Sequence, residues 1–283
     1  MWYSLARPQL DGSDVPLLAQ REHVRTGWTK RTPTSTITLL DGTIAVHPGT
    51  HPEKPNSTMA GSYAAACTPA DLTPEWVIAF EPYLRTWDVG CRALQGYLDD
   101  FCAYEMLVDG QRLVGQQRAG CSSGHLSMSR DRLVAHVVQV TKTDLHGCAQ
   151  GIYHEYAHLR LETLGIEIET HDGTLLLNAD TELYTSSVRS DKPRPMSAVL
   201  HGVYAWLMFT ENDYHVYQAN ACGCNPSHAK SRFTQYTQHN IPKIQNGIAE
   251  IQRYGKFTPD GAEFIRGVYD WADDLCARCT ALY

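Results

Sequence analysis

The pentapeptide His154-Glu155-Tyr156-Ala157-His158 constrains the fold of this chain most, because its chemistry depends on a helix. On an α-helix, two histidines four residues apart lie on one face, one turn apart, and both imidazoles can bind one metal ion. Thr143 or Asp144 is a suitable N-cap for such a helix, and Gly165 is a suitable end. One face stays apolar through Leu145, Cys148, Ile152, Tyr156 and Leu159.

A catalytic metal site needs a third protein ligand and an open position. His201 is one candidate, because it is a polar residue within the apolar segment 196–209, which predicts a long helix. Glu182 is the alternative, 24 residues after His158, close to the separation at which gluzincin proteases supply a Glu. Glu162 and His171 are weaker candidates, since the first points past the metal on a straight helix and the second lies in a predicted loop.

Glu155 has a defined role in zinc proteases that carry H-E-x-x-H, where it is the general base for the attacking water. The sequence therefore supports a zinc metallopeptidase with Glu155 as the catalytic residue. It equally supports a different metal enzyme that uses the same pair of histidines, with Glu155 orienting a ligand or a bound water.

Composition excludes several classes of protein. Hydrophobic residues make up 43% of the 283 residues and charged residues 19%, which is typical of a chain with a buried core. The net charge of −7 and the lack of Lys/Arg blocks disfavour nucleic acid as a partner. We see neither a secretory signal pattern nor an apolar run of membrane-spanning length, so the sequence predicts a cytoplasmic protein without a membrane partner.

The apolar patterns predict a mainly helical α+β fold with a small β element near the N-terminus. Residues 35–47 predict a hairpin around Asp41-Gly42, and residues 73–109 have helical spacing divided near Pro82 and Gly90. The β-branched run at 132–140 favours a strand, and residues 241–279 are predicted to be helical. We divide the chain into an N-terminal region, 1–130, and a metal-binding helical region, 131–283, which can also pack as one domain.

Four of the nine cysteines are spaced as metal ligands. Cys222 and Cys224 form a C-x-C, and Cys276 and Cys279 form a C-x-x-C. Four thiolates can hold a structural zinc that ties down the C-terminal region. The alternative is that these residues, like the other five cysteines, are free thiols in a reducing compartment.

The segment 189–206, Arg-Ser-Asp-Lys-Pro-Arg-Pro-Met-Ser-Ala-Val-Leu-His-Gly-Val-Tyr-Ala-Trp, resembles a known pattern. Together with the upstream His-Glu-Tyr-Ala-His-Leu-Arg-Leu, it is similar to the H-E-x-x-H domain of peptide-modifying proteins. That family is encoded with ribosomally made peptides and is sometimes fused to radical-SAM enzymes. The resemblance covers roughly residues 145–210, and the sequence departs from the family pattern at Val188 and Lys192.

The resemblance implies a non-haem iron(II), 2-oxoglutarate-dependent hydroxylase that acts on side chains of a peptide or amino acid. Such enzymes need a ligand face with three open positions for the keto acid and oxygen. The far carboxylate of the keto acid needs a cation, and a bidentate Arg is the natural partner. We expect Arg194 or Arg189 in this role, with Arg160 as the third candidate.

Three hypotheses remain open from the sequence. The first is the iron(II)/2-oxoglutarate hydroxylase, and the second is the zinc metallopeptidase. The third is a non-catalytic module that binds a leader peptide or a partner enzyme, against which the intact His-Glu-His triplet argues.

Overall fold

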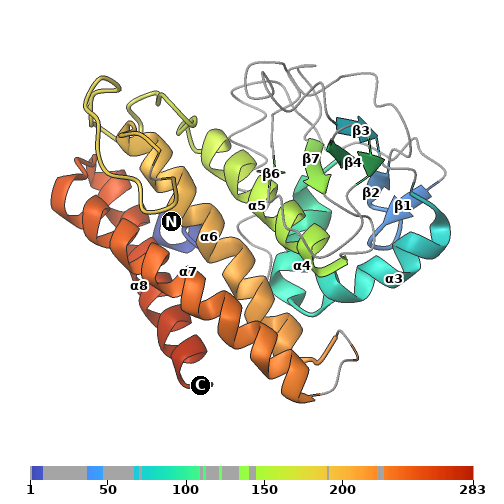
Figure 1. The fold of residues 1–283 in the computed structure, drawn as a ribbon. Coiled ribbons are helices and arrows are strands. Elements are labelled where there is room, and N and C mark those ends of the chain that lie inside the picture. Colours follow the sequence, from blue (N-terminus) through green and yellow to red (C-terminus); the bar gives the residue numbers. More distant parts are fainter. Residues whose placement is uncertain are drawn as a thin grey trace.

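The structure is a computed structural model of the whole chain. The residues described below are 2–8, 37–46, 67–69, 72–108, 111–112, 121–122, 134–139, 145–189, 191–221, 223 and 226–282. They form a layer of long helices packed against a sheet that carries two helices of its own (Figure 1). The predicted class, mainly helical with a β element towards the N-terminus, is confirmed.

The sheet has the strand order β1-β2-β4-β7-β6, with β3 and β5 also paired to β4. Both β2 and β7 run parallel to β4, and the helices α3 (Pro74–Arg85) and α4 (Asp88–Tyr97) lie in the connection between β2 and β4. The strand bounds are Ile37–Leu39 (β1), Ile44–Val46 (β2), Cys67–Pro69 (β3), Asp100–Val108 (β4), Gln111–Arg112 (β5), Cys121–Ser122 (β6) and Val134–Gln139 (β7).

The two strands predicted around Asp41-Gly42 and the strand predicted at 132–140 are confirmed as β1, β2 and β7. The hairpin turn uses positive φ angles at Leu40, Asp41 and Gly42, of which only glycine adopts such a conformation freely. The register pairs Ile37 with Val46, so the turn sets the alignment of this edge of the sheet.

The helical prediction for 73–109 is correct for its first part and wrong for its end. Helices α3 (Pro74–Arg85) and α4 (Asp88–Tyr97) meet near Trp87, and the divisions predicted near Pro82 and Gly90 are wrong, because Pro82 lies within α3 and Gly90 within α4. Leu98 is extended, and β4 follows. Phe101, which we assigned to the helical pattern, lies buried at the start of the strand. A short apolar run is compatible with both the helical repeat and the strand repeat. Here the hydrogen-bonded pairing of β4 with β7 stabilises the strand.

Helix α5 (Leu145–Thr163) carries the H-E-x-x-H motif and lies between the sheet and α6 (Figure 1). It ends as predicted at Gly165, where φ is +85° and a Cβ would stand 2.2 Å from the carboxylate of Asp172. Hydrogen bonds from Tyr153 to the Leu84 carbonyl and from Tyr97 to the Leu159 carbonyl fix α5 on α3 and α4.

Helices α6 (Met196–Gln218), α7 (Pro226–Tyr254) and α8 (Pro259–Thr280) form the rest of the helical layer. The predicted helix at 196–209 is confirmed. The predicted start at 241 is wrong by a full fifteen residues, because α7 already begins at Pro226 and runs through an exposed Pro242. At Gly247 of α7, a Cβ would stand 2.2 Å from the side chain of Val203, so the two helices approach closely there.

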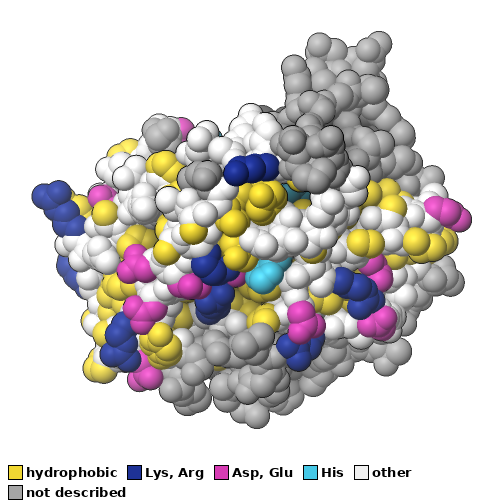
Figure 2. Space-filling model, turned by 90° about the horizontal axis from the view of Figure 1, so that it is seen from below, with side chains coloured by type: hydrophobic (Ala, Val, Ile, Leu, Met, Phe, Trp, Pro, Cys, Tyr) yellow, Lys and Arg dark blue, Asp and Glu magenta, His cyan; other side chains and the backbone are white. Residues whose placement is uncertain are grey.

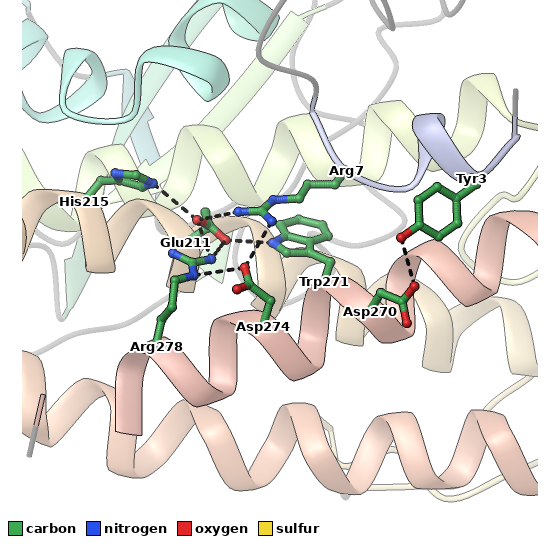
Figure 3. Close-up of polar contacts among 8 residues, drawn as sticks. All are labelled: Tyr3, Arg7, Glu211, His215, Asp270, Trp271, Asp274 and Arg278. Atoms are coloured by element: carbon green, nitrogen blue, oxygen red, sulfur yellow. Dashed lines mark hydrogen bonds and ion pairs between the residues drawn. The ribbon is translucent and has the colours of Figure 1, made fainter. Parts of the chain in front are cut away.

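The N-terminal helix α1 (Trp2–Leu5) packs against α8, and a buried carboxylate fixes the segment that follows it (Figure 3). Glu211 of α6 accepts hydrogen bonds from Arg7, Arg278 and the indole of Trp271. Burial raises the pKa of Glu211, but His215, Arg278 and Arg7 outweigh it and lower the pKa to about 2. Glu211 therefore links the segment after α1 to helix α8.

Figure 2 shows one face of the molecule, on which acidic and basic side chains are interspersed among apolar ones. Among the described side chains of that face, neither sign of charge gathers into one large patch. Within the described part of the chain, no helix combines the length and the apolar character needed to cross a bilayer.

Candidate metal centre

The structure brings the two motif histidines and His201 together. His154 and His158 lie on the side of α5 that faces α6, and their Nε2 atoms are 2.9 Å apart. His201 reaches the same place from α6, with its Nδ1 atom 2.9 Å from Nδ1 of His158. His158 is therefore the centre of a row of three imidazoles, which we call the histidine row.

The backbone carbonyl of Ile166 orients this row. Its oxygen is 2.7 Å from Nε2 of His201, and a carbonyl can only accept, so neutral His201 carries its proton on Nε2. The lone pair of His201 Nδ1 then faces His158, which must donate from its own Nδ1. By the same reasoning His154 donates from Nε2 to Nε2 of His158, so one carbonyl sets the tautomer of all three rings.

The histidines at the two ends of the row are neutral at pH 7. Burial lowers the pKa of His201 to about 4, although the Ile166 carbonyl opposes this. Burial also lowers the pKa of His154 to about 4, and nearby His201 adds to the effect. A neutral imidazole is the form that binds a metal ion.

Three neutral imidazoles are a donor set suited to zinc or iron(II). Nitrogen ligands about 2.1 Å from a metal are roughly 3.0–3.4 Å apart at octahedral or tetrahedral angles, close to both contacts in the row. His158, however, presents a different nitrogen to each neighbour. Among the described residues, no three or more His, Cys, Asp or Glu side chains surround one point as they would a metal. The donor set fits a metal once the His158 ring turns and the proton of His154 moves from Nε2 to Nδ1, so that all three lone pairs can be directed to it.

Glu155 is fully buried on α5. It follows His154 by one residue, so its side chain leaves the helix about 100° around the axis from that of His154. The histidine row is formed without it.

The three candidate arginines differ in what they bind. Arg160 is buried and donates to the hydroxyls of Tyr204 and Tyr156 and to the carbonyl of Leu5. Its guanidinium thus fastens the N-terminal segment to α5 and α6, and the expected keto-acid contact at Arg160 gains no support.

The other two arginines lie on the segment before α6. Arg194 donates to both carboxylate oxygens of Asp191 at 3.0 Å, and its backbone pairs with that of Tyr184. Arg189 is exposed, and the described residues provide no ion pair for it. Their expected role in binding a carboxylate stays a prediction.

Glu182 lies in a different network from the histidine row. Its carboxylate accepts hydrogen bonds from Lys256, at 2.8 and 2.9 Å, and from the Tyr184 hydroxyl, and these contacts lower its pKa. The structure therefore contradicts Glu182 as the third ligand. His171 also lies outside the row, bound to the carbonyl of Asn178.

The predicted cysteine site cannot be assembled from the described residues, because Cys222 and Cys224 lie outside them. Cys276 and Cys279 are buried on α8. Burial raises the pKa of Cys276 to about 11 and that of Cys279 to about 12, which favours the thiol over the metal-binding thiolate.

Several residues beside the row were not singled out from the sequence. Phe209 stacks on His154 with ring centroids 6.0 Å apart, and Trp206 packs on Phe209. Asp213, buried on α6, accepts hydrogen bonds from His146 and Gln150 of α5. A sequence signal exists for the α5 side: His146, Gln150, His154 and His158 recur every four residues and so share one helix face.

Asn212 of α6 is fully buried, and neither its Oδ1 nor its Nδ2 has a hydrogen-bond partner among the described residues. An unsatisfied buried polar group costs about 1–3 kcal/mol. We therefore expect Asn212→Leu, similar in volume, to raise the free energy of unfolding by about 1 kcal/mol in urea denaturation. The matched control is Asn240→Leu, which removes a buried bond to Thr210 and should be destabilising. A loss of stability in Asn212→Leu equal to that in the control would refute this account.

No model of a known protein family matches the chain, and no curated protein sequence is significantly similar to it.

Proposed function

We propose that the protein is a metal-dependent hydroxylase that uses iron(II) and 2-oxoglutarate to oxidise a side chain of a peptide or an amino acid. The substrate is a precursor peptide of a modified natural product, bound with or without help from its leader segment. His154, His158 and His201 hold the ion. The overall reaction converts R–H, dioxygen and 2-oxoglutarate into R–OH, succinate and carbon dioxide.

The contact between His201 and His158 is the observation that carries this proposal. It joins the H-E-x-x-H helix to the segment 189–206, and these are the two parts of the sequence that resemble the peptide-modifying family. If the three histidines held iron(II), they would leave coordination positions open for the keto acid and oxygen. A third imidazole in place of a carboxylate also leaves the site one charge more positive, which favours a dicarboxylate co-substrate.

The zinc metallopeptidase remains the second candidate, favoured by the intact position of Glu155 between the two motif histidines. Against it stands Glu182, the residue at the gluzincin ligand position, which is bound to Lys256. A peptidase would have to use His201 as its third ligand.

Succinate formation separates the two candidates. We expect the chain, loaded anaerobically with iron(II), to convert 2-oxoglutarate to succinate when oxygen is admitted, and faster with an acceptor peptide. His154→Ala should lose this activity, and Lys230→Met, an exposed change on α7, should retain it. Peptide fragments after zinc loading, with no succinate after iron loading, would establish the peptidase and make Glu155 the residue to replace.

A further inference from the structure

Two aromatic side chains lead away from the histidine row along α6. The ring of Phe209 lies 6.0 Å from that of His154 at an interplanar angle of 21°, and Trp206 lies 4.8 Å from Phe209. Both side chains are partly exposed. We call this pair the aromatic shelf.

A lysine lies at the far end of the shelf. The Nζ atom of Lys243 on α7 is 4.5 Å from the Trp206 ring centroid, and His239 packs on the same indole. Lys243 is partly buried, and loss of solvent lowers its pKa. Its contact with the indole offsets only part of that cost.

Several described cations of the helical layer are paired with a carboxylate, and Lys243 is not one of them. Arg7, Arg194, Lys256 and Arg278 each form an ion pair. The described residues supply none to Lys243. A partly desolvated cation without an anion is a binding site for one, because pairing restores the charge interaction that solvent no longer gives.

The segment before α6 adds a second cation to this edge. Ser187 donates to the backbone carbonyl of Lys243 at 2.7 Å, and Val188 lies against Gly202, where a Cβ would be 3.3 Å away. Arg189 follows directly and is exposed without an ion pair among the described residues. Arg189 is thus a second basic residue two positions after Ser187, although Asp191 interacts with its charge and the chain carries a net charge of −7.

We propose that Lys243 binds a carboxylate whose apolar stem lies on the aromatic shelf. The ligand is a dicarboxylate or an acidic peptide side chain, and its identity as co-substrate or substrate rests on the proposed function.

Binding to the zinc-loaded chain tests this proposal by calorimetry. The probes are 2-oxoglutarate with 2-oxopentanoate, which lacks the far carboxylate, and N-acetyl-glutamate amide with N-acetyl-glutamine amide. We expect Lys243→Met, which keeps an unbranched chain over Trp206, to raise the Kd of an acidic probe at least tenfold. Lys243→Arg should restore most of the affinity. The neutral probes and the Lys230→Met control should be unaffected, as should zinc affinity.

The results with the two acidic probes distinguish a co-substrate site from a substrate site. An effect confined to 2-oxoglutarate assigns Lys243 to the co-substrate, and one confined to the glutamate probe assigns it to the substrate. Equal affinity of both acidic probes for wild type and Lys243→Met, or no binding to either, would overturn the proposal. If iron loading yields no succinate while Lys243-dependent binding persists, the hydroxylase assignment fails and the carboxylate site stands.

Discussion

Replacing His201 by alanine is expected to abolish metal binding. The wild-type chain should retain about one ion of zinc or iron(II) after gel filtration, and His201→Ala should retain almost none. Removing a residue that only supports a metal ligand by a hydrogen bond typically lowers metal affinity roughly 10- to 100-fold. Removing the third ligand itself should lower the affinity by more than this. Competition with a chromophoric chelator measures the two affinities.

Two further variants separate ligation from folding. His201→Gln keeps a side chain that can donate to the Ile166 carbonyl, so the helix packing is preserved while the imidazole is lost. His239→Ala removes an exposed histidine that packs on Trp206 outside the histidine row, and it should bind metal like wild type. Unchanged affinity in both His201 variants would show that His201 is no ligand.

Replacing Glu211 by glutamine is expected to cost about 3 kcal/mol of unfolding free energy at pH 7. The carboxylate is buried between Arg7 and Arg278, and an amide cannot compensate either charge. Its pKa falls to about 2 in the folded chain, below the ordinary value of about 4.3. Because the folded value is the lower one, this stability is complete above about pH 4.3 and is lost as the pH falls towards 2.

Urea denaturation as a function of pH measures this effect. Wild type should lose stability steeply between about pH 4.3 and 2, and Glu211→Gln should show a flatter dependence there. Asp270→Asn is the control, because it also joins the chain ends, through an exposed hydrogen bond to Tyr3, and should change stability by less than about 1 kcal/mol. Equal small losses in both variants would show that the Glu211 cluster does not stabilise the fold.

The sequence predicted those parts of the fold that local signals determine. The hairpin at Asp41-Gly42, the end of the motif helix at Gly165 and the apolar helix around His201 each depend on a few neighbouring residues. The strand at 100–108 was assigned to a helix because its identity comes from pairing with β7, far along the chain. The start of α7 was missed because Pro242 is tolerated on the exposed side of that helix.

The same distinction holds for the candidate site. The spacing of His154 and His158 shows that they share a helix face. His201 was a candidate because it is a polar residue within an apolar helix. The Ile166 carbonyl and Lys243 carry no sequence signal, because their roles arise from tertiary contacts. The expected role of Arg160 gains no support, because Arg160 lies on another side of α5 than the two histidines, where it binds Leu5, Tyr156 and Tyr204.

Arg160 and Glu211 connect the fold to the site. Both bind the N-terminal segment, one from α5 and the other from α6. These are the two helices whose approach brings His158 to His201. The polar anchors of the N-terminus therefore support the spacing on which the proposed metal site depends.

X-ray absorption of the metal-loaded chain tests the central claim most directly. The measurement uses one equivalent of zinc and a chain with Cys222→Ser and Cys224→Ser, so that the predicted cysteine site cannot compete. The account predicts three imidazole nitrogens at about 2.0–2.1 Å and no sulfur. Sulfur ligands at about 2.3 Å, or a shell with fewer than three imidazoles, would contradict the assignment of His154, His158 and His201 as the metal centre.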